Sequence, residues 1–133
     1  MTLWLLFWTI GALSLGWLAE RWWCQILKEA ENAYKKGAYR YCMVFSGRGP
    51  SKKRVEFLSG VIKRIKDNFP IEVCLSPGLI SAEDAKHLAD AGLDRYNHNL
   101  NTSESYYEKI CTTHTFKDRL DTLSNVNANN IDI

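Results

Sequence analysis

The chain has 133 residues, a formal net charge of +2 and 46% hydrophobic residues. These values predict no more than one ordinary globular domain, and the near-neutral charge with dispersed basic residues argues against a nucleic-acid-binding protein. The cysteines (Cys24, Cys42, Cys74 and Cys111) form no C-x-x-C pair, a spacing that argues against a zinc knuckle and against a disulfide framework.

The first 23 residues differ from the remainder of the chain. They contain all five tryptophans, and residues 3–19 carry no charge. Such a run reaches the lower limit of about 17 residues for a membrane-spanning helix. No Lys or Arg precedes it, which disfavours a signal peptide. Three interpretations stay open: an apolar membrane helix, a signal peptide, and a segment foreign to the domain at 24–133, such as a misread gene start or a fusion scar; we prefer the last.

The residues from 25 onward alternate between helical and extended patterns. Apolar residues recur at helical spacing from Val55 to Phe69, where Pro70 stops the helix. Aromatic and β-branched residues predict a strand on either side of this helix. In chain order we expect a helix at 26–36 ended by Gly37, a strand at 38–45, a loop at 46–51, the helix ending at 69, a strand at 71–75 and a turn at 76–78.

The second half continues the alternation. Ser81 with Asp84 three residues later resembles a capping box, and predicts a helix at 82–91 that Gly92 ends. The remaining elements are a third strand at 93–100, a short helix at 104–110, a helix that starts at Thr115 with Asp118 and runs to 126, and the start of a fourth strand at 131–133. Strands that alternate with helices predict parallel βαβ units, which fit both an open doubly wound sheet and a (β/α)₈ barrel.

The strands have one polar face. Side chains alternate between the two faces of a strand, and one set is strongly polar: Arg40, Cys42, Glu72, Cys74, Arg95, Asn97 and Asn99. Burying such a set unpaired under helices would cost about 1–3 kcal/mol per group. We therefore predict a barrel whose bore holds a ligand. The asparagine amides could bind a ribose diol or a urea-like ring; alternatively they pair with one another or with inward Arg and Glu side chains.

The cysteines and histidines allow more than one interpretation. Cys42 and Cys74 occupy corresponding places on adjacent strands, which are about 4.8 Å apart, so they either hold one metal cluster or pack as small apolar side chains. Cys111 is expected to pack, His98 to act as a buried hydrogen-bonding support, and His114 and Arg119 to have structural or capping roles. We assign no catalytic residue, because the sequence shows neither a nucleophile with a paired base nor closely spaced carboxylates.

Three segments carry a family resemblance: YRYCMVFSGRGPS, DAGLDRYNHNLNTSESYYEKI and TTHTFKDRLDTL. They closely resemble the biotin synthases, which are radical S-adenosylmethionine enzymes, and the similarity covers residues 26–133. It implies an α/β fold, part of a (β/α)₈ TIM-type barrel with about three βα units plus a strand start. It also implies a sulfurtransferase activity, the insertion of sulfur into dethiobiotin to give biotin.

The resemblance also implies site residues. Asn97 would contact dethiobiotin, Asn99 and Asn101 would bind S-adenosylmethionine, and Cys42 and Cys74 would be two of three cysteine ligands of a 2Fe-2S cluster, the third lying beyond residue 133. Many members have aspartate where Asn101 stands. The family's 4Fe-4S cluster uses a C-x-x-x-C-x-x-C motif that this sequence lacks. We therefore expect an incomplete biotin synthase that is inactive alone.

Two other functions stay open at this point. One is a non-catalytic interaction protein, either membrane-anchored through residues 3–19 or self-associating through unpaired strand edges. The other is an S-adenosylmethionine binder without catalysis. Expected partners are dethiobiotin, S-adenosylmethionine and a second copy in a homodimer, with no nucleic acid. The expected location is the cytoplasm, with membrane association as the alternative.

Overall fold

The computed structural model describes residues 21–133, and helix covers 21–35 of this range. The elements that follow are β1 (Arg40–Val44), α2 (Lys52–Asn68), β2 (Glu72–Ser76), α3 (Ala82–Asp90), β3 (Arg95–Tyr96), α4 (Glu104–Ile110) and α5 (Phe116–Ala128). Their order and type confirm the predicted alternation of helices and strands. The apolar segment at 3–19 lies outside the described residues, so its interpretation stays a prediction.

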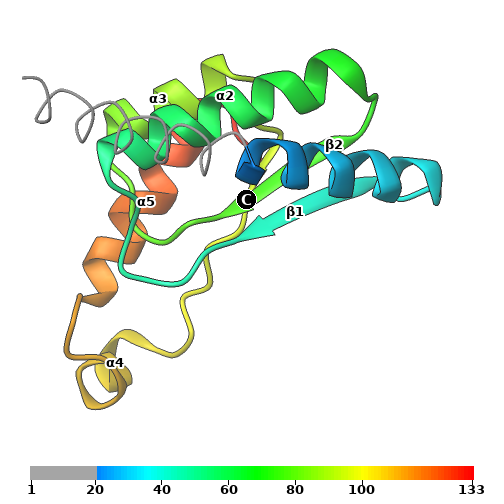
Figure 1. The fold of residues 1–133 in the computed structure, drawn as a ribbon. Coiled ribbons are helices and arrows are strands. Elements are labelled where there is room, and N and C mark those ends of the chain that lie inside the picture. The colour runs from blue at the N-terminus through cyan, green and yellow to red at the C-terminus, as the bar shows by residue number, and fades with distance from the viewer. Residues whose placement is uncertain (1–20) are drawn as a thin grey trace, which may run out of the picture.

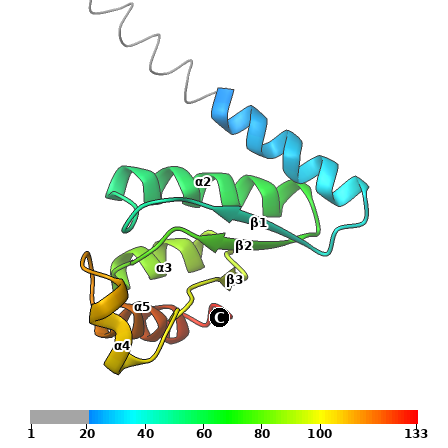
Figure 2. The same ribbon diagram turned by 90° about the horizontal axis from the view of Figure 1, so that it is seen from below.

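The strands form one parallel sheet in the order β1-β2-β3. Asp132 adds a parallel bridge to Arg95, which agrees with a fourth strand starting near residue 131. Helices α2, α3 and α5 cover one face of the sheet, and the strands lie in front of them when the molecule is seen from below (Figures 1 and 2). This one-sided arrangement is consistent with part of a (β/α)₈ barrel, in which the helices form the outer layer.

The core lies between the sheet and its helices. Helix α2 begins at Ser51, whose hydroxyl accepts a hydrogen bond from the Arg54 backbone N–H at 3.3 Å, and it buries one apolar face (Val55, Leu58, Val61, Ile62 and Ile65). Burying a Val, Leu or Ile side chain contributes about 1.5–3 kcal/mol. Helices α3 and α5 begin with the capping boxes Ser81/Asp84 and Thr115/Asp118, as predicted. Local signals thus fix where the helices start.

The burial of side chains confirms the predicted alternation of faces in β1, whereas in β2 Cys74 is buried together with Val73 and Leu75. Met43 is buried against the helices, whereas Arg40, Cys42 and Val44 are exposed on the opposite face. In β2, Val73 and Leu75 are completely buried. The open face therefore carries the polar side chains of the strands.

The third strand is shorter than the predicted 93–100, because only Arg95 and Tyr96 have strand conformation. Tyr96 is the partner of Leu75, and one further hydrogen bond joins the Asn97 N–H to the Leu75 carbonyl at 2.9 Å. β2 then ends at Ser76, and the next residue, Pro77, has no N–H for a ladder. The prediction that Asn97 and Asn99 lie inside a strand is therefore wrong, because they belong to the loop that follows it.

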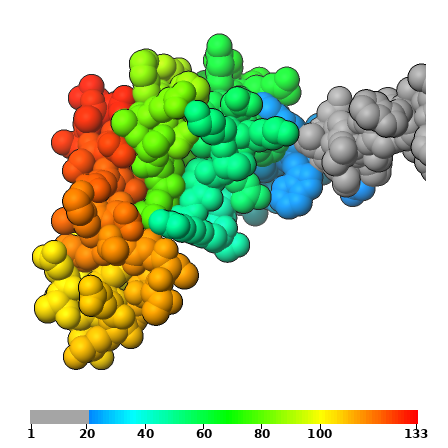
Figure 3. Space-filling view, turned by 90° about the vertical axis from the view of Figure 1, so that its left-hand side faces the viewer, coloured from blue at the N-terminus to red at the C-terminus, as the bar shows by residue number. Residues whose placement is uncertain are grey.

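Within residues 21–133, no helix combines the length and the apolar character needed to cross a membrane. Helix α4 and the loop after it project from one end of the molecule, below α5 and the strands (Figure 3). This projecting end adjoins the loops at the carboxyl ends of the strands, where the candidate site lies.

Candidate functional site

The loops at the carboxyl ends of the strands enclose a cavity of about 160 Å³, which we call the asparagine cavity. Ligands of barrels and of open parallel sheets bind at this end of the strands. The cavity brings together all three asparagines selected from the sequence, although Asn97, Asn99 and Asn101 follow β3 instead of lying within it. Its lining residues are Phe45, Gly47, Arg48, Ser76, Gly78, Leu79, Asn97, His98, Asn99, Asn101, His114 and Arg119.

The asparagine amides are available for a ligand. Among the described residues, the side chains of Asn97, Asn99 and Asn101 make no hydrogen bond, which argues against the alternative that they pair with one another. Asn97 and Asn99 are exposed. Asn101 has a φ of 67°, in the left-handed region that asparagine tolerates better than most residues. The backbone therefore turns at Asn101 without glycine, and keeps an amide at the cavity.

Two glycines allow the cavity wall to form. The Leu79 N–H donates to the Arg48 carbonyl at 2.8 Å, which joins the β1–α2 loop to the β2–α3 loop. Gly78 has a φ of +102°, and a Cβ there would lie 2.9 Å from the carbonyl carbon of Arg48 and closer still to its oxygen. A Cβ on Gly49 would meet the Leu79 carbonyl oxygen in the same way. The two loops can approach this closely because both positions are glycine.

Side-chain hydrogen bonds from Tyr96, Asn125 and Arg119 also fix the loops that form the cavity wall. The buried Tyr96 donates its phenol O–H to the Gly78 carbonyl at 2.5 Å. Asn125 of α5 donates from Nδ2 to the Ile80 carbonyl at 3.1 Å. On the other side, Arg119 Nη1 donates to the backbone carbonyl of Asn99. The structural role expected for Arg119 is thus supported, because α5 fixes both loops that border the cavity.

His98 contributes a buried hydrogen-bonding atom. Its Nε2 is buried and has no hydrogen-bond partner among the described residues. Burial lowers the pKa of His98 to about 4, and the nearby charges of Arg119 and His114 act in the same direction. The imidazole is therefore neutral near pH 7. The expected supporting role therefore finds no hydrogen-bond partner at Nε2 among the described residues.

Cys42 and Cys74 are direct partners in the parallel pairing of β1 and β2. Cys42 is exposed on the open face, whereas Cys74 is 4% exposed. Burial raises the pKa of Cys74 to about 11, helped by a hydrogen bond with Cys42, while the charges of Arg40 and Arg95 act against it. The two thiols are thus direct neighbours across β1 and β2.

This pair is not a complete ligand set within the described chain. No group of three or more His, Cys, Asp or Glu side chains in residues 21–133 is arranged to hold a metal ion. Two other polar residues of the open face are already paired with each other, because Arg40 contacts Glu72 at 2.7 Å. Tyr39 donates to the same carboxylate. These hydrogen bonds, that from Tyr39 first, lower the pKa of Glu72. Arg40 and Glu72 therefore pair with each other, and among the described residues neither forms a hydrogen bond with the asparagine amides.

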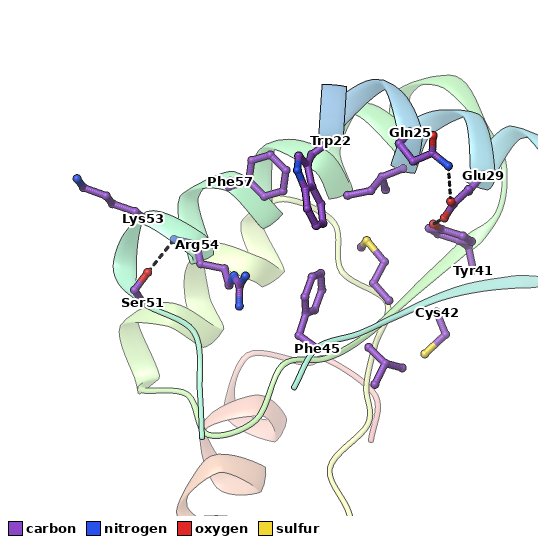
Figure 4. A pocket seen from close by; sticks show the side chains of 13 residues that line it. Trp22, Gln25, Glu29, Tyr41, Cys42, Phe45, Ser51, Lys53, Arg54 and Phe57 are labelled. Atoms are coloured by element: carbon purple, nitrogen blue, oxygen red, sulfur yellow. Dashed lines mark hydrogen bonds between the residues drawn. The ribbon is translucent and has the colours of Figure 1, made fainter. Parts of the chain in front are cut away.

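A larger cavity of about 600 Å³ lies on the helical side of β1. Its wall combines the helix at 21–35, β1 and α2, and it includes the aromatic side chains of Trp22, Phe45 and Phe57 (Figure 4). Cys42 borders this cavity, yet its sulfur points away from the aromatic cluster (Figure 4). None of the three asparagines lines this cavity.

Sequence reasoning missed Arg48 and Ser76 as lining residues. Both belong to segments classified as a loop or a turn, and the signal that could have identified them is the Gly-Arg-Gly sequence of residues 47–49 directly after a strand. Such a loop must lie at the carboxyl end of a parallel sheet. It therefore had to border any site formed there.

Comparison with known proteins adds family information. The family model that represents the Radical SAM superfamily matches residues 14–133 of this sequence. Similar curated proteins include the biotin synthase of Magnetococcus marinus, 57% identical over 99 residues, which are 74% of this chain and 31% of that protein. The biotin synthases of Leptospira biflexa and Acaryochloris marina are 58% and 54% identical, over 74% and 81% of this chain and 28% and 31% of those proteins. The chain spans less than a third of the length of these relatives.

Proposed function

This chain belongs to the radical SAM superfamily, and on that premise we propose that it forms part of the catalytic barrel of a biotin synthase, which inserts sulfur into dethiobiotin. The observation that carries the proposal is the asparagine cavity, where three unpaired amides meet at the carboxyl end of a parallel sheet. The high identity to named biotin synthases supports the same conclusion.

Within this proposal, Asn99 and Asn101 bind the ribose hydroxyls of S-adenosylmethionine, and Asn97 binds the ureido ring of dethiobiotin. An amide offers one acceptor oxygen and two N–H donors. It can therefore accept from a hydroxyl and also bind the N–H and C=O groups of a urea-like ring. His98, which also lines the cavity, stays neutral near pH 7 because burial lowers its pKa to about 4. Uncharged polar groups suit both ligand parts, since neither a ribose diol nor a ureido group is ionised.

Cys42 and Cys74 supply two thiolates for a 2Fe-2S cluster in this proposal. Their direct pairing across β1 and β2 fits two ligands of one cluster. When bound, the cluster supplies sulfur for the product. Arg40 and Arg95 would offset part of the negative charge of the thiolates, because their charges already act to lower the pKa of Cys74.

We further propose that residues 1–133 alone bind S-adenosylmethionine without converting dethiobiotin. The sequence contains no C-x-x-x-C-x-x-C motif, and therefore lacks the three cysteines that hold the 4Fe-4S cluster in the family it resembles. Binding needs the cavity, whereas radical formation needs that cluster. The two properties can therefore be separated in an experiment.

Isothermal titration calorimetry with S-adenosylmethionine tests the proposal. The wild-type chain should give saturable binding, and Asn99→Ala should weaken it about tenfold, which corresponds to about 1.4 kcal/mol of lost hydrogen bonding. Asn127→Ala is the matched control, because Asn127 is exposed on α5 and does not line the cavity. Folded wild-type protein that gives no saturable heat, or equal affinities for the two variants, would refute the assignment.

A further inference from the structure

A cluster of nucleophilic and basic side chains lies beside the asparagine cavity, in the loop between α4 and α5. Cys111 Sγ is 3.4 Å from His114 Nδ1 and 3.5 Å from Thr113 Oγ1. Thr113 Oγ1 and His114 Nδ1 are 2.9 Å apart. We call these three residues the Cys111 cluster. The sequence predicted only a packing role for Cys111, but the structure gives its sulfur two polar partners.

A chain of hydrogen bonds orients the histidine of the cluster. Arg119 Nε donates to the Tyr107 phenol oxygen, so the phenol O–H is directed to His114 Nε2, 2.9 Å away. Burial and the charge of Arg119 lower the pKa of His114, which keeps the ring neutral near pH 7. A neutral ring that accepts at Nε2 carries its proton on Nδ1. That N–H faces Thr113 and the Cys111 sulfur, where it can stabilise a thiolate.

The charged groups around the cluster come from three elements and oppose one another. Arg48 lies on the β1–α2 loop, Glu104 and Glu108 on α4, and Lys117 and Asp118 on α5. Hydrogen bonds from the Thr113 side chain and backbone lower the pKa of Cys111, and the His114 backbone N–H acts in the same direction. Direct donors therefore decide the state of this thiol.

The Cys111 cluster also has space in front of it. Cys111, Thr113 and His114 border a cavity of about 550 Å³ beside the asparagine cavity. Cys111 is partly exposed, so a small reagent can reach its sulfur. A stabilised, reachable thiolate beside an open cavity meets the requirements of a reactive cysteine.

From this geometry we propose that Cys111 is a modification site that reacts with small disulfides by thiol–disulfide exchange. The Cys111 thiolate attacks one sulfur of the disulfide and forms a new S–S bond, while the other sulfur leaves as a thiolate that takes up a proton from solvent. The disulfide is the oxidant, and Cys111 is oxidised to the mixed disulfide. His114 and Arg48 border both cavities, so the modified side chain lies next to the asparagines. This inference does not depend on the proposed function.

The test uses 4,4′-dithiodipyridine on the whole chain, with the labelled cysteine identified by mass spectrometry of peptides. The reference is a synthetic peptide of residues 105–118, in which Cys111 is fully accessible but the fold is absent. At pH 7 we expect Cys111 to react faster in the folded chain than in the peptide. The rate should be about threefold higher for every pH unit by which the fold lowers the pKa of Cys111. This factor combines about tenfold more thiolate with its roughly threefold lower intrinsic nucleophilicity.

Two variants separate the cluster from general accessibility. Thr113→Val removes the hydroxyl beside the sulfur and should slow the reaction at pH 7 about threefold. Thr112→Val is the matched control, because Thr112 borders the same cavity but donates no hydrogen bond to Cys111. Circular dichroism establishes that each variant is folded. Wild-type reactivity at or below that of the peptide at pH 6–7, or equal effects of the two variants, would overturn the proposal.

Discussion

Gly78→Ala should destabilise the protein far more than Gly37→Ala, and this pair of variants tests how the asparagine cavity is built. Both glycines have positive φ, +79° at Gly37 and +102° at Gly78. A Cβ on Gly37 meets nothing within 4 Å, whereas one on Gly78 collides with the carbonyl group of Arg48. Gly37→Ala therefore introduces backbone strain alone, about 1–2 kcal/mol. Gly78→Ala adds a steric conflict between two loops.

The additional cost at Gly78 has two parts. Relieving the collision must separate the loops that the Leu79 N–H and the Arg48 carbonyl join at 2.8 Å, and one such hydrogen bond contributes about 1 kcal/mol. Crowding in a packed region costs about 1–3 kcal/mol more. We therefore expect a loss of about 3–6 kcal/mol in the free energy of unfolding for Gly78→Ala.

Urea unfolding followed by circular dichroism measures both variants against the wild type. Calorimetry should also show weaker S-adenosylmethionine binding for Gly78→Ala at a temperature where it is folded, and unchanged binding for Gly37→Ala. Equal losses of stability in the two variants would show that the close approach of the loops contributes nothing, and would refute this account of the cavity wall.

Three further predictions concern the site itself. Asn101→Asp should strengthen S-adenosylmethionine binding in calorimetry about threefold, because a carboxylate accepts hydroxyl protons more strongly than an amide; weaker binding would contradict a ribose contact. Anaerobic reconstitution with iron and sulfide should give visible cluster absorbance that Cys42→Ala or Cys74→Ala each reduces at least about twofold, whereas Cys24→Ala should leave it unchanged. The free energy of unfolding should fall as the pH drops from about 6.5 to about 4, because the unfolded chain protonates His98 while the folded chain, with its pKa of about 4, does not. In urea unfolding His98→Gln should reduce this fall by about 1–2 kcal/mol after allowance for solvent screening, and an unchanged pH dependence would contradict the burial of a neutral ring.

Features encoded within a few residues could be predicted from the sequence, and features that depend on a distant partner could not. Ser81 with Asp84 gives a helix start because the donors and acceptors of a capping box lie within one turn. The end of β3 is decided by Pro77, which directly follows the neighbouring strand β2, and the sequence around Asn97 does not reveal this. The contact of Cys111 with His114 likewise depends on Tyr107 and Arg119, which belong to two different helices.

The early end of β3 also accounts for the three asparagines of this segment. A strand continuing to residue 100 would have engaged the backbone there in pairing and would have kept Asn101 at its far end. Instead the loop turns through a left-handed residue at Asn101, so that its amide borders the same cavity as Asn97 and Asn99. Asparagine meets both demands at this position, since it tolerates positive φ and carries donors and an acceptor. Aspartate meets the backbone demand as well, whereas Asn101→Ala would combine about 1–2 kcal/mol of backbone strain with the loss of the ligand contact. Glycine would meet the backbone demand most easily but would bring no side chain to the cavity, so only asparagine or aspartate serves both the turn and the proposed ribose contact.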